Sequence, residues 1–248
     1  MENNAFKKGV KQVVEIIKLA MPSLIIYAAV GGILMMLTMK EDGTIVWDNA
    51  KFGWTALCFV LGISYNVMAA YSQGGVGYDM LVSGNKQRRA DDIGTTLKIS
   101  KYNEYLEYRE WKGFVCGFVT ALPTLILPLV FGANEEIINK IHENSGFVAG
   151  ADMGVIVLVG FFLSGWTLLP CFYLNGAGIA VSYYYMSLFA LVPILVTGFS
   201  YIWGAYAKRN KALRMVEERA EKQAREQAVR TGKVNYGGLP GTQPKKRK

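Results

Sequence analysis

Residues 179–207 read IAVSYYYMSLFALVPILVTGFSYIWGAYA, and the basic run KRNK follows directly. The stretch contains no charged side chain. A helix needs about 20 mostly apolar residues to cross the ~30 Å hydrocarbon core of a membrane. Residues 179–207 therefore predict a membrane-spanning helix that is longer than necessary, so that it tilts or extends past the bilayer.

Four similar apolar runs precede this stretch, at about 18–38, 53–72, 113–132 and 153–171. The chain has 248 residues, of which 52% are hydrophobic and 19% charged, and the charged share is below the roughly 25% of an ordinary soluble domain. Three cysteines are too few for a secreted disulfide scaffold. The pattern excludes a soluble globular domain and a disordered chain. It predicts an all-α, polytopic helical membrane bundle over residues 1–207, with five apolar segments.

The N-terminal stretch has the pattern of an amphipathic helix. Apolar residues recur at helical spacing opposite a basic face, and the two sets are Phe6, Val10, Val13, Val14 and Ile17 against Lys7, Lys8, Lys11 and Lys18. Its charged part is too long for a signal peptide, and no cleavage site follows. We expect a helix on the cytoplasmic face that runs into the first span, with a kink at Pro22.

Basic residues set the expected orientation of the other segments. The N-terminal stretch holds four lysines and the loop 73–112 holds seven Lys/Arg, whereas the loops 39–52 and 133–152 hold two and one. Loops rich in Lys and Arg stay in the cytoplasm. The N-terminus and the loop 73–112 are therefore predicted to be cytoplasmic, and the other two loops external.

The C-terminal tail conflicts with five crossings. Residues 208–248 carry 13 basic and 4 acidic residues, a net charge of +9, whereas residues 1–207 carry a net charge of −1. Five crossings put this tail outside, and its charge puts it inside. Either the tail is external, or one apolar segment is re-entrant or broken. The two segments with helix-breaking residues are 113–132 and 166–182, and we favour a cytoplasmic tail.

The loop 73–112 contains two features that bear on binding. It opens with Gln73-Gly74-Gly75-Val76-Gly77, for which we expect a flexible hinge in preference to an anion-binding nest. The basic cluster that follows, Lys86, Arg88 and Arg89, is either a determinant of topology or a contact for a phosphate or lipid headgroup.

The end of this loop, residues 98–112, predicts an interfacial helix. Four aromatic residues recur every third position, namely Tyr102, Tyr105, Tyr108 and Trp111. Aromatic rings with polar tips favour the membrane interface. The alternative is a coupling helix that docks a soluble partner such as an ATPase subunit.

Inside the spans only neutral polar groups occur, which argues against a proton- or sodium-coupled carrier. Asn66 and Asn175 are the costliest to leave unpaired, and we expect hydrogen bonds across helices in preference to a ligand site. The candidate cavity residues are Asn66, Trp166, Pro170, Asn175, Gly176 and Gly178. The glycines and the proline are typical of a discontinuous helix that lines a transport site, whereas Tyr183–Tyr185 fit an aromatic belt.

The residues of enzymes and metal sites are missing. His142 is the one histidine, and it has no partner cysteines and no H-E-x-x-H or G-x-S-x-G pattern. Cys58, Cys116 and Cys171 fall in three different apolar segments. We therefore expect no catalytic residues, no metal and no cofactor.

The tail predicts a charged helix to about residue 230 and a disordered end. Glu and Lys/Arg pair at i,i+4 spacing through the helical part. Residues 231–248 are rich in Gly and Pro and end in Lys245, Lys246, Arg247 and Lys248. A basic tail attracts anionic lipid, RNA or an acidic protein, or simply fixes the sidedness of the C-terminus.

A small helical bundle with a basic C-terminal tail resembles the bacterial membrane insertases, whose tails contact ribosomes. The resemblance lies in architecture. Those insertases carry an intramembrane arginine in a polar groove, and this chain has no charged residue at that depth.

Together these features predict a non-enzymatic membrane adaptor or assembly factor in the bacterial plasma membrane. Its expected partners are the bilayer itself and, through the tail, anionic lipid, RNA or the ribosome, or a protein; homo-oligomers remain open. The alternative is a transporter membrane subunit for a neutral or aromatic solute, coupled to an ATPase through residues 98–112.

Overall fold

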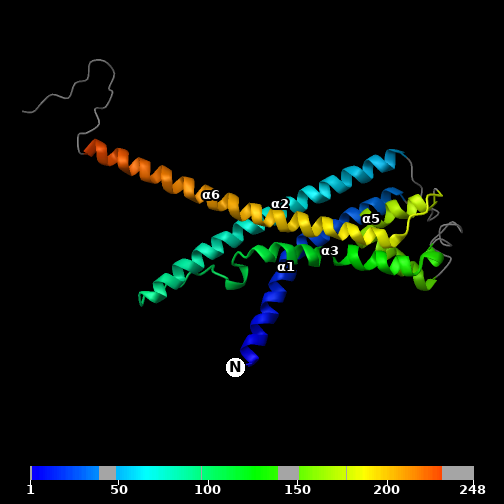
Figure 1. Ribbon diagram of the computed structural model, residues 1–248, viewed down its shortest axis with the longest axis horizontal. Coiled ribbons are helices and arrows are strands. Elements are labelled where there is room, and N and C mark those ends of the chain that lie inside the picture. The colour runs from blue at the N-terminus through cyan, green and yellow to red at the C-terminus, as the bar shows by residue number, and fades with distance from the viewer. Residues whose placement is uncertain (1, 39–48, 96, 139–150, 177, 231–248) are drawn as a thin grey trace, which may run out of the picture. The chain divides into compact units, whose positions relative to one another are not determined.

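The computed structural model describes residues 2–38, 49–95, 97–138, 151–176 and 178–230. The chain divides into two compact units, Met1–Ala205 and Tyr206–Lys248. In chain order the elements are α1 (Glu2–Thr38), α2 (Asn49–Asp92), the 3-10 turn η1 (Glu104–Leu106), α3 (Glu110–Ala133), α5 (Ala151–Gly176), the 3-10 helix η3 (Tyr183–Ala190) and α6 (Leu191–Arg230) (Figure 1).

The all-α prediction is confirmed, since the described part of the chain contains no strand. Five helices are long and apolar enough to cross a membrane. By length and composition the chain is a multi-pass membrane protein.

Helix α1 unites the predicted amphipathic helix with the first apolar segment. Pro22 lies inside it, and Figure 1 shows α1 bending part way along its length. Proline removes a backbone donor and crowds the preceding turn, which is the usual cause of such a bend.

Helix α2 continues far past its apolar segment, to Asp92, so the predicted hinge at residues 73–77 is wrong. The glycines serve close packing against α6 instead. A Cβ atom on Gly74 would lie 1.9 Å from the Tyr201 carbonyl oxygen, and one on Gly204 would lie 1.9 Å from the Tyr71 carbonyl oxygen. The two backbones therefore touch where α2 and α6 cross, which only glycine permits. The 44 residues of α2 span roughly 66 Å, about twice a hydrocarbon core.

Helix α5 turns back on itself. Ser164 has a non-helical backbone (φ −132°, ψ 23°), and the rings of Phe161 and Phe172 lie 5.3 Å apart. Eleven residues of straight helix would separate them by about 16 Å. The two arms, residues 151–163 and 165–176, are each about 20 Å long or less. Helix α5 therefore has the length of a membrane span only when its two arms are counted together, and neither arm alone crosses ~30 Å of hydrocarbon.

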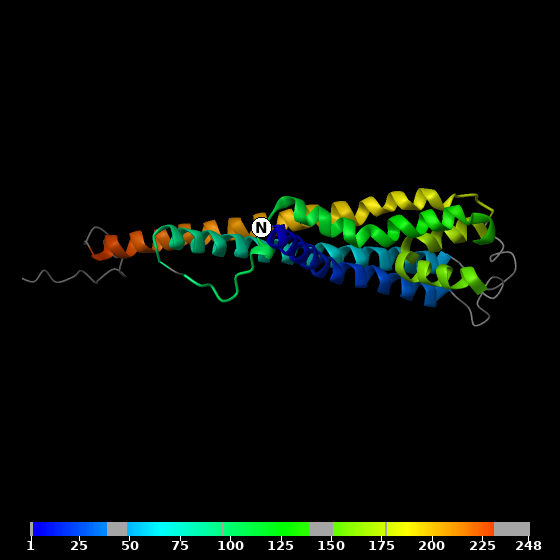
Figure 2. The same ribbon diagram turned by 90° about the horizontal axis from the view of Figure 1, so that it is seen from below.

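The turn of α5 rests on α1. A Cβ on Gly31 would lie 2.2 Å from the Phe162 carbonyl oxygen, and the Cβ position of Gly165 is 3.0 Å from the Gly31 Cα. Thr167 donates its hydroxyl to the Ser164 carbonyl at 3.0 Å, which satisfies one acceptor freed by the turn. Figure 2 shows both arms of α5, in yellow-green, at one end of the helices.

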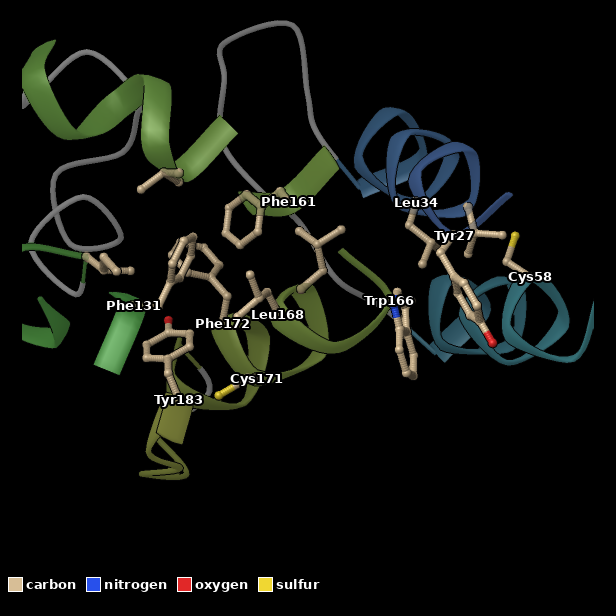
Figure 3. Packing of buried hydrophobic residues seen from close by; sticks show 14 residues of the cluster. Tyr27, Leu34, Cys58, Phe131, Phe161, Trp166, Leu168, Cys171, Phe172 and Tyr183 are labelled. Atoms are coloured by element: carbon tan, nitrogen blue, oxygen red, sulfur yellow. The ribbon is translucent and has the colours of Figure 1, made fainter. Parts of the chain in front are cut away.

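The main core lies at this end, which we call the hairpin end. Phe131 of α3 contacts both Phe161 and Tyr183 edge to face, with ring centroids 5.7 and 5.6 Å apart (Figure 3). Such pairs stabilise beyond the area they bury. Phe131 lies near the end of α3, which precedes α5 in the chain, and Tyr183 begins η3, which follows α5. Their contact therefore places the start and the end of α5 at the same end of the bundle.

Helix α3 holds together in spite of Pro123 and Pro128 and packs on α6. The Cβ position of Gly113 is 2.7 Å from the Tyr201 Cβ, and that of Gly117 is 2.8 Å from the Ile194 Cα. These small residues serve packing within the bundle.

The second unit contains the rest of α6. The predicted helix is present to Arg230, and its side chains from Lys208 to Gln227 are exposed except for the partly buried Ala212. The predicted disordered end, residues 231–248, lies outside the described residues.

Candidate functional site

Residues 93–109, which we call the strap, connect α2 to α3 at the end of the bundle opposite the hairpin end; Thr96 within it is not described. The predicted helix over 98–112 is wrong. A single 3-10 turn, Glu104–Leu106, is followed by extended backbone at Glu107 and Arg109.

Contacts with other elements keep the strap out of a helix. The Tyr108 amide donates to the Gly77 carbonyl of α2 at 3.0 Å, and the Tyr108 ring stacks on Tyr201 of α6 at 5.5 Å. Asn103 accepts from the Tyr105 amide at 3.0 Å and caps the single turn. Tyr102, Tyr105 and Tyr108 are therefore partly buried against other elements. Of the four aromatic residues, Trp111 alone is exposed, at 42%.

Glu107 is the centre of the strap. Glu107 is only 6% exposed. Its Oε1 accepts a hydrogen bond from the Tyr102 hydroxyl at 2.5 Å and pairs with Arg88 of α2 at 3.1 Å. A buried carboxylate requires such partners. Gly84 makes room for them, because a Cβ there would meet Glu107 Oε1 and the Tyr102 ring.

The Tyr102 hydroxyl responds to this environment. Burial raises the pKa of Tyr102 to about 12, and its hydrogen bond to the Glu107 carboxylate acts in the same direction. The phenol therefore stays protonated and remains a donor to Glu107 throughout the physiological pH range.

Lys112, at the start of α3, fixes the other side of the strap. It is 2% exposed, and its Nζ donates to the carbonyl oxygens of Tyr105 at 2.7 Å and Glu107 at 2.6 Å. Hydrogen bonds from a charged donor are the stronger kind. Two basic residues thus hold the strap: Arg88 pairs with the Glu107 side chain, and Lys112 donates to backbone carbonyls of Tyr105 and Glu107.

The residues of the predicted anion contact lie in two separate parts of the chain, on α2 and at the C-terminal end. Lys86, Arg88 and Arg89 lie on helix α2, and not in a loop. All three side chains are exposed. Arg88 also pairs with Glu107 and donates to Asn85 at 3.0 Å. Lys245, Lys246, Arg247 and Lys248 lie outside the described residues.

Asn66 joins three helices inside the bundle, as expected. It is fully buried, accepts from Ser23 of α1 at 2.7 Å, and donates to Tyr27 of α1 at 3.3 Å and to Thr197 of α6 at 3.1 Å. All of its capacity is used within the protein, so Asn66 does not contribute to a cavity.

The remaining cavity candidates divide. Trp166 and Pro170 line an apolar pocket of about 410 Å³ between α2, α5 and η3, together with Thr55, Ala56, Phe59 and others. Asn175 does not line it. Its side chain pairs with the Val181 backbone at 2.9 and 2.7 Å and so closes the turn after α5, in which Gly178 has φ +83°. Gly176 is the last residue of α5.

The pocket is lined mainly by apolar side chains. The Trp166 indole stacks on Phe59, with centroids 5.4 Å apart, and its Nε1 has no hydrogen-bond partner among the described residues. Cys171 also lines the pocket, and like Cys58 and Cys116 it is buried with a free thiol. No group of three or more potential metal ligands gathers in the described ranges; His142 lies outside them.

The sequence did not single out Glu107 or Lys112. Glu107 forms its ion pair with Arg88, which is nineteen positions away along the chain, and no local sequence pattern predicts that pair. One indication was present at Lys112, which is a charged residue directly before an apolar segment. A charged residue at such a position is usually solvated, so the pattern did not predict its burial.

Comparison with protein families, with curated proteins and with solved structures found no match to this chain.

Proposed function

We propose that the protein is a non-enzymatic membrane adaptor or assembly factor, whose basic C-terminal region binds a polyanion or an acidic partner at the cytoplasmic face of a bacterial plasma membrane. The observation that carries this proposal is the continuity of α6. One helix runs from the apolar Leu191 to Arg230 and presents exposed basic side chains after Ala207.

The folded-back α5 supports a cytoplasmic tail. If α1, α2, α3 and α6 cross and α5 enters and leaves at one face, the chain crosses four times. Its two termini then lie on one side, as the lysines near the N-terminus and the net charge of +9 in residues 208–248 both require. Under this arrangement, the number of crossings and the positive charge of the tail no longer disagree.

The first test is the sidedness of the tail. A cysteine replaces Thr242 in a version with all three native cysteines changed to Ala, and intact cells are treated with a membrane-impermeant maleimide. We expect protection until lysis. Labelling in intact cells would place the tail outside and eliminate a cytoplasmic partner.

The second test concerns the partner. Purified protein in detergent is titrated with fluorescent polyuridylate and, separately, with an acidic polyglutamate. We expect binding that weakens steeply with salt, since neutralised charges release counterions. Neutralising Lys208, Arg209, Lys211 and Arg214 to Gln should weaken it, whereas changing Glu217, Glu218, Glu221 and Glu226 to Gln should strengthen it. Binding to neither polymer contradicts the proposal.

The transporter alternative keeps one supporting observation, the pocket lined by Trp166 and Pro170, but its coupling helix is absent. The change Trp111→Ala separates the two functions, because Trp111 is the exposed ring of the four. An adaptor tolerates it, and a subunit that docks an ATPase there does not.

A further inference from the structure

The first turns of α1 carry an apolar face that the bundle leaves uncovered. Phe6 is 72% exposed and Val13 is 55% exposed. Burial begins at Ile16 and Ala20, which pack with Cys116 of α3. Figure 1 shows the N-terminal part of α1 running away from the other helices. An exposed apolar face of this kind on a basic helix is typical of a helix that lies in the membrane interface.

Two grooves of opposite character adjoin this face. One, of about 700 Å³, is lined by Phe6, Lys7, Lys8, Val10, Lys11 and Tyr105. The other, of about 360 Å³, is lined only by Phe6, Gly9, Val10, Val13 and Val14. Phe6 and Val10 belong to both grooves, so a basic surface and an apolar surface meet along one helical edge.

Within the described ranges, no acidic side chain neutralises the charge of the three lysines Lys7, Lys8 and Lys11. Two nearby carboxylates are engaged elsewhere, Glu15 by Lys18 at 3.2 Å and Glu107 by Arg88 at 3.1 Å. The groove therefore favours an anion.

The far wall of the basic groove is fixed. Tyr105 belongs to the strap, where its carbonyl accepts from Lys112 at 2.7 Å and its amide donates to Asn103 at 3.0 Å. Because Lys112 begins the apolar helix α3, this wall is anchored at the level where the membrane segments start. A headgroup there meets a rigid surface on one side and long lysine side chains on the other.

We propose that these two grooves bind one anionic phospholipid, with its phosphate against Lys7, Lys8 and Lys11 and an acyl chain along Phe6, Val10, Val13 and Val14. The ligand needs both parts, since a free anion would leave the apolar groove empty and a neutral lipid would leave the lysines unpaired. This site is separate from the basic tail and stands independently of the proposed function.

The test uses the full chain in mild detergent and native mass spectrometry with added phosphatidylglycerol or phosphatidylcholine. The site variant carries Lys7→Gln, Lys8→Gln and Lys11→Gln. The matched control carries Lys98→Gln, Lys101→Gln and Arg109→Gln, which removes the same charge from the strap. All six side chains are exposed, so both variants should fold.

We expect phosphatidylglycerol to bind the wild type more tightly than phosphatidylcholine. The site variant should lose about 100-fold in affinity at low salt, at about fivefold for each lysine, while the control loses little. Equal affinity for the two lipids, or equal losses in the two triple variants, would overturn the site. A second variant, Val13→Ser with Val14→Ser, changes residues that line only the apolar groove and adds no charge. It should weaken phosphatidylglycerol binding, and unchanged binding would exclude the apolar groove.

Discussion

Asn66 and Thr197 exchange two hydrogen bonds inside the bundle, because the Asn66 amide donates to the Thr197 hydroxyl at 3.1 Å and the hydroxyl donates back to the Asn66 carbonyl oxygen at 3.2 Å. Ser23 and Tyr27 bond to the same asparagine from α1. One side chain of α2 thus links α1 to α6.

Changing Asn66 to Leu should destabilise the protein by about 1–3 kcal/mol, because it leaves several buried polar groups without a partner. Unfolding by detergent titration measures the loss. Thr120→Val is the matched control, since the Thr120 hydroxyl donates to the Cys116 carbonyl of its own helix and has no other hydrogen-bond partner in the part of the chain that the structure describes. Equal losses in the two variants would show that Asn66 does not link helices.

Gly74→Ala should destabilise the crossing of α2 and α6 by about 1–3 kcal/mol, because the added methyl group meets backbone that cannot move aside. Gly75→Ala is the control at the next position, where the nearest atom lies 3.9 Å away. It should leave the melting temperature unchanged or raise it slightly through higher helix propensity. The crossing is disproved if the two variants melt alike.

The turn in α5 predicts a cross-link. In the cysteine-free background, Phe161→Cys with Phe172→Cys should react with a short bifunctional maleimide to join the two positions. Leu191→Cys with Ile202→Cys, eleven residues apart in the unbroken α6, should not, because a straight helix holds them about 16 Å apart. Peptide mass spectrometry gives the readout. A straight α5 would leave both pairs unlinked.

Tyr102 predicts a titration at high pH. Its pKa is raised from 10.0 to about 12, so the folded strap holds a proton that the unfolded chain releases. The strap's contribution to stability is full below pH 10 and is lost as pH rises toward about 12. The absorbance difference between wild type and Tyr102→Phe isolates this phenol.

Glu107→Gln should lower the midpoint of that difference titration without restoring it to the usual value, because burial is the larger cause of the shift. Glu104→Gln is the control, since Glu104 is exposed and acts on Tyr102 only at a distance. A midpoint near 10 in the wild type would contradict the buried contact with Glu107.

Local properties could be predicted from the sequence, and contacts between distant segments could not. Hydropathy located the five apolar segments, and charge pairing located the helix that ends at Arg230. The hydrogen bonds of Asn66 followed from the cost of burying an amide. In each case the deciding residues lie close together along the chain or act alone.

The errors share one cause. Gly74, Gly75 and Gly77 disfavour a helix by propensity, yet contact with α6 keeps α2 helical through them. Tyr102, Tyr105 and Tyr108 have helical spacing, yet Gly77, Tyr201 and Glu107 hold the strap extended. The turn at Ser164 belongs to neither stretch that contains the breaking residues of the sequence, 113–132 and 166–182.

The folded-back α5 has a consequence for biogenesis. Its 21-residue apolar stretch, Val155–Asn175, has the hydropathy of a complete span, so a translocon that reads hydropathy alone would pass it straight across the bilayer. The eight basic residues between Lys208 and Arg230 oppose that outcome, because the end of α6 would then have to be exported. In the proposed orientation the charges that follow the last span therefore determine the shape of the segment before it, and removing them should release α5 into a fifth crossing.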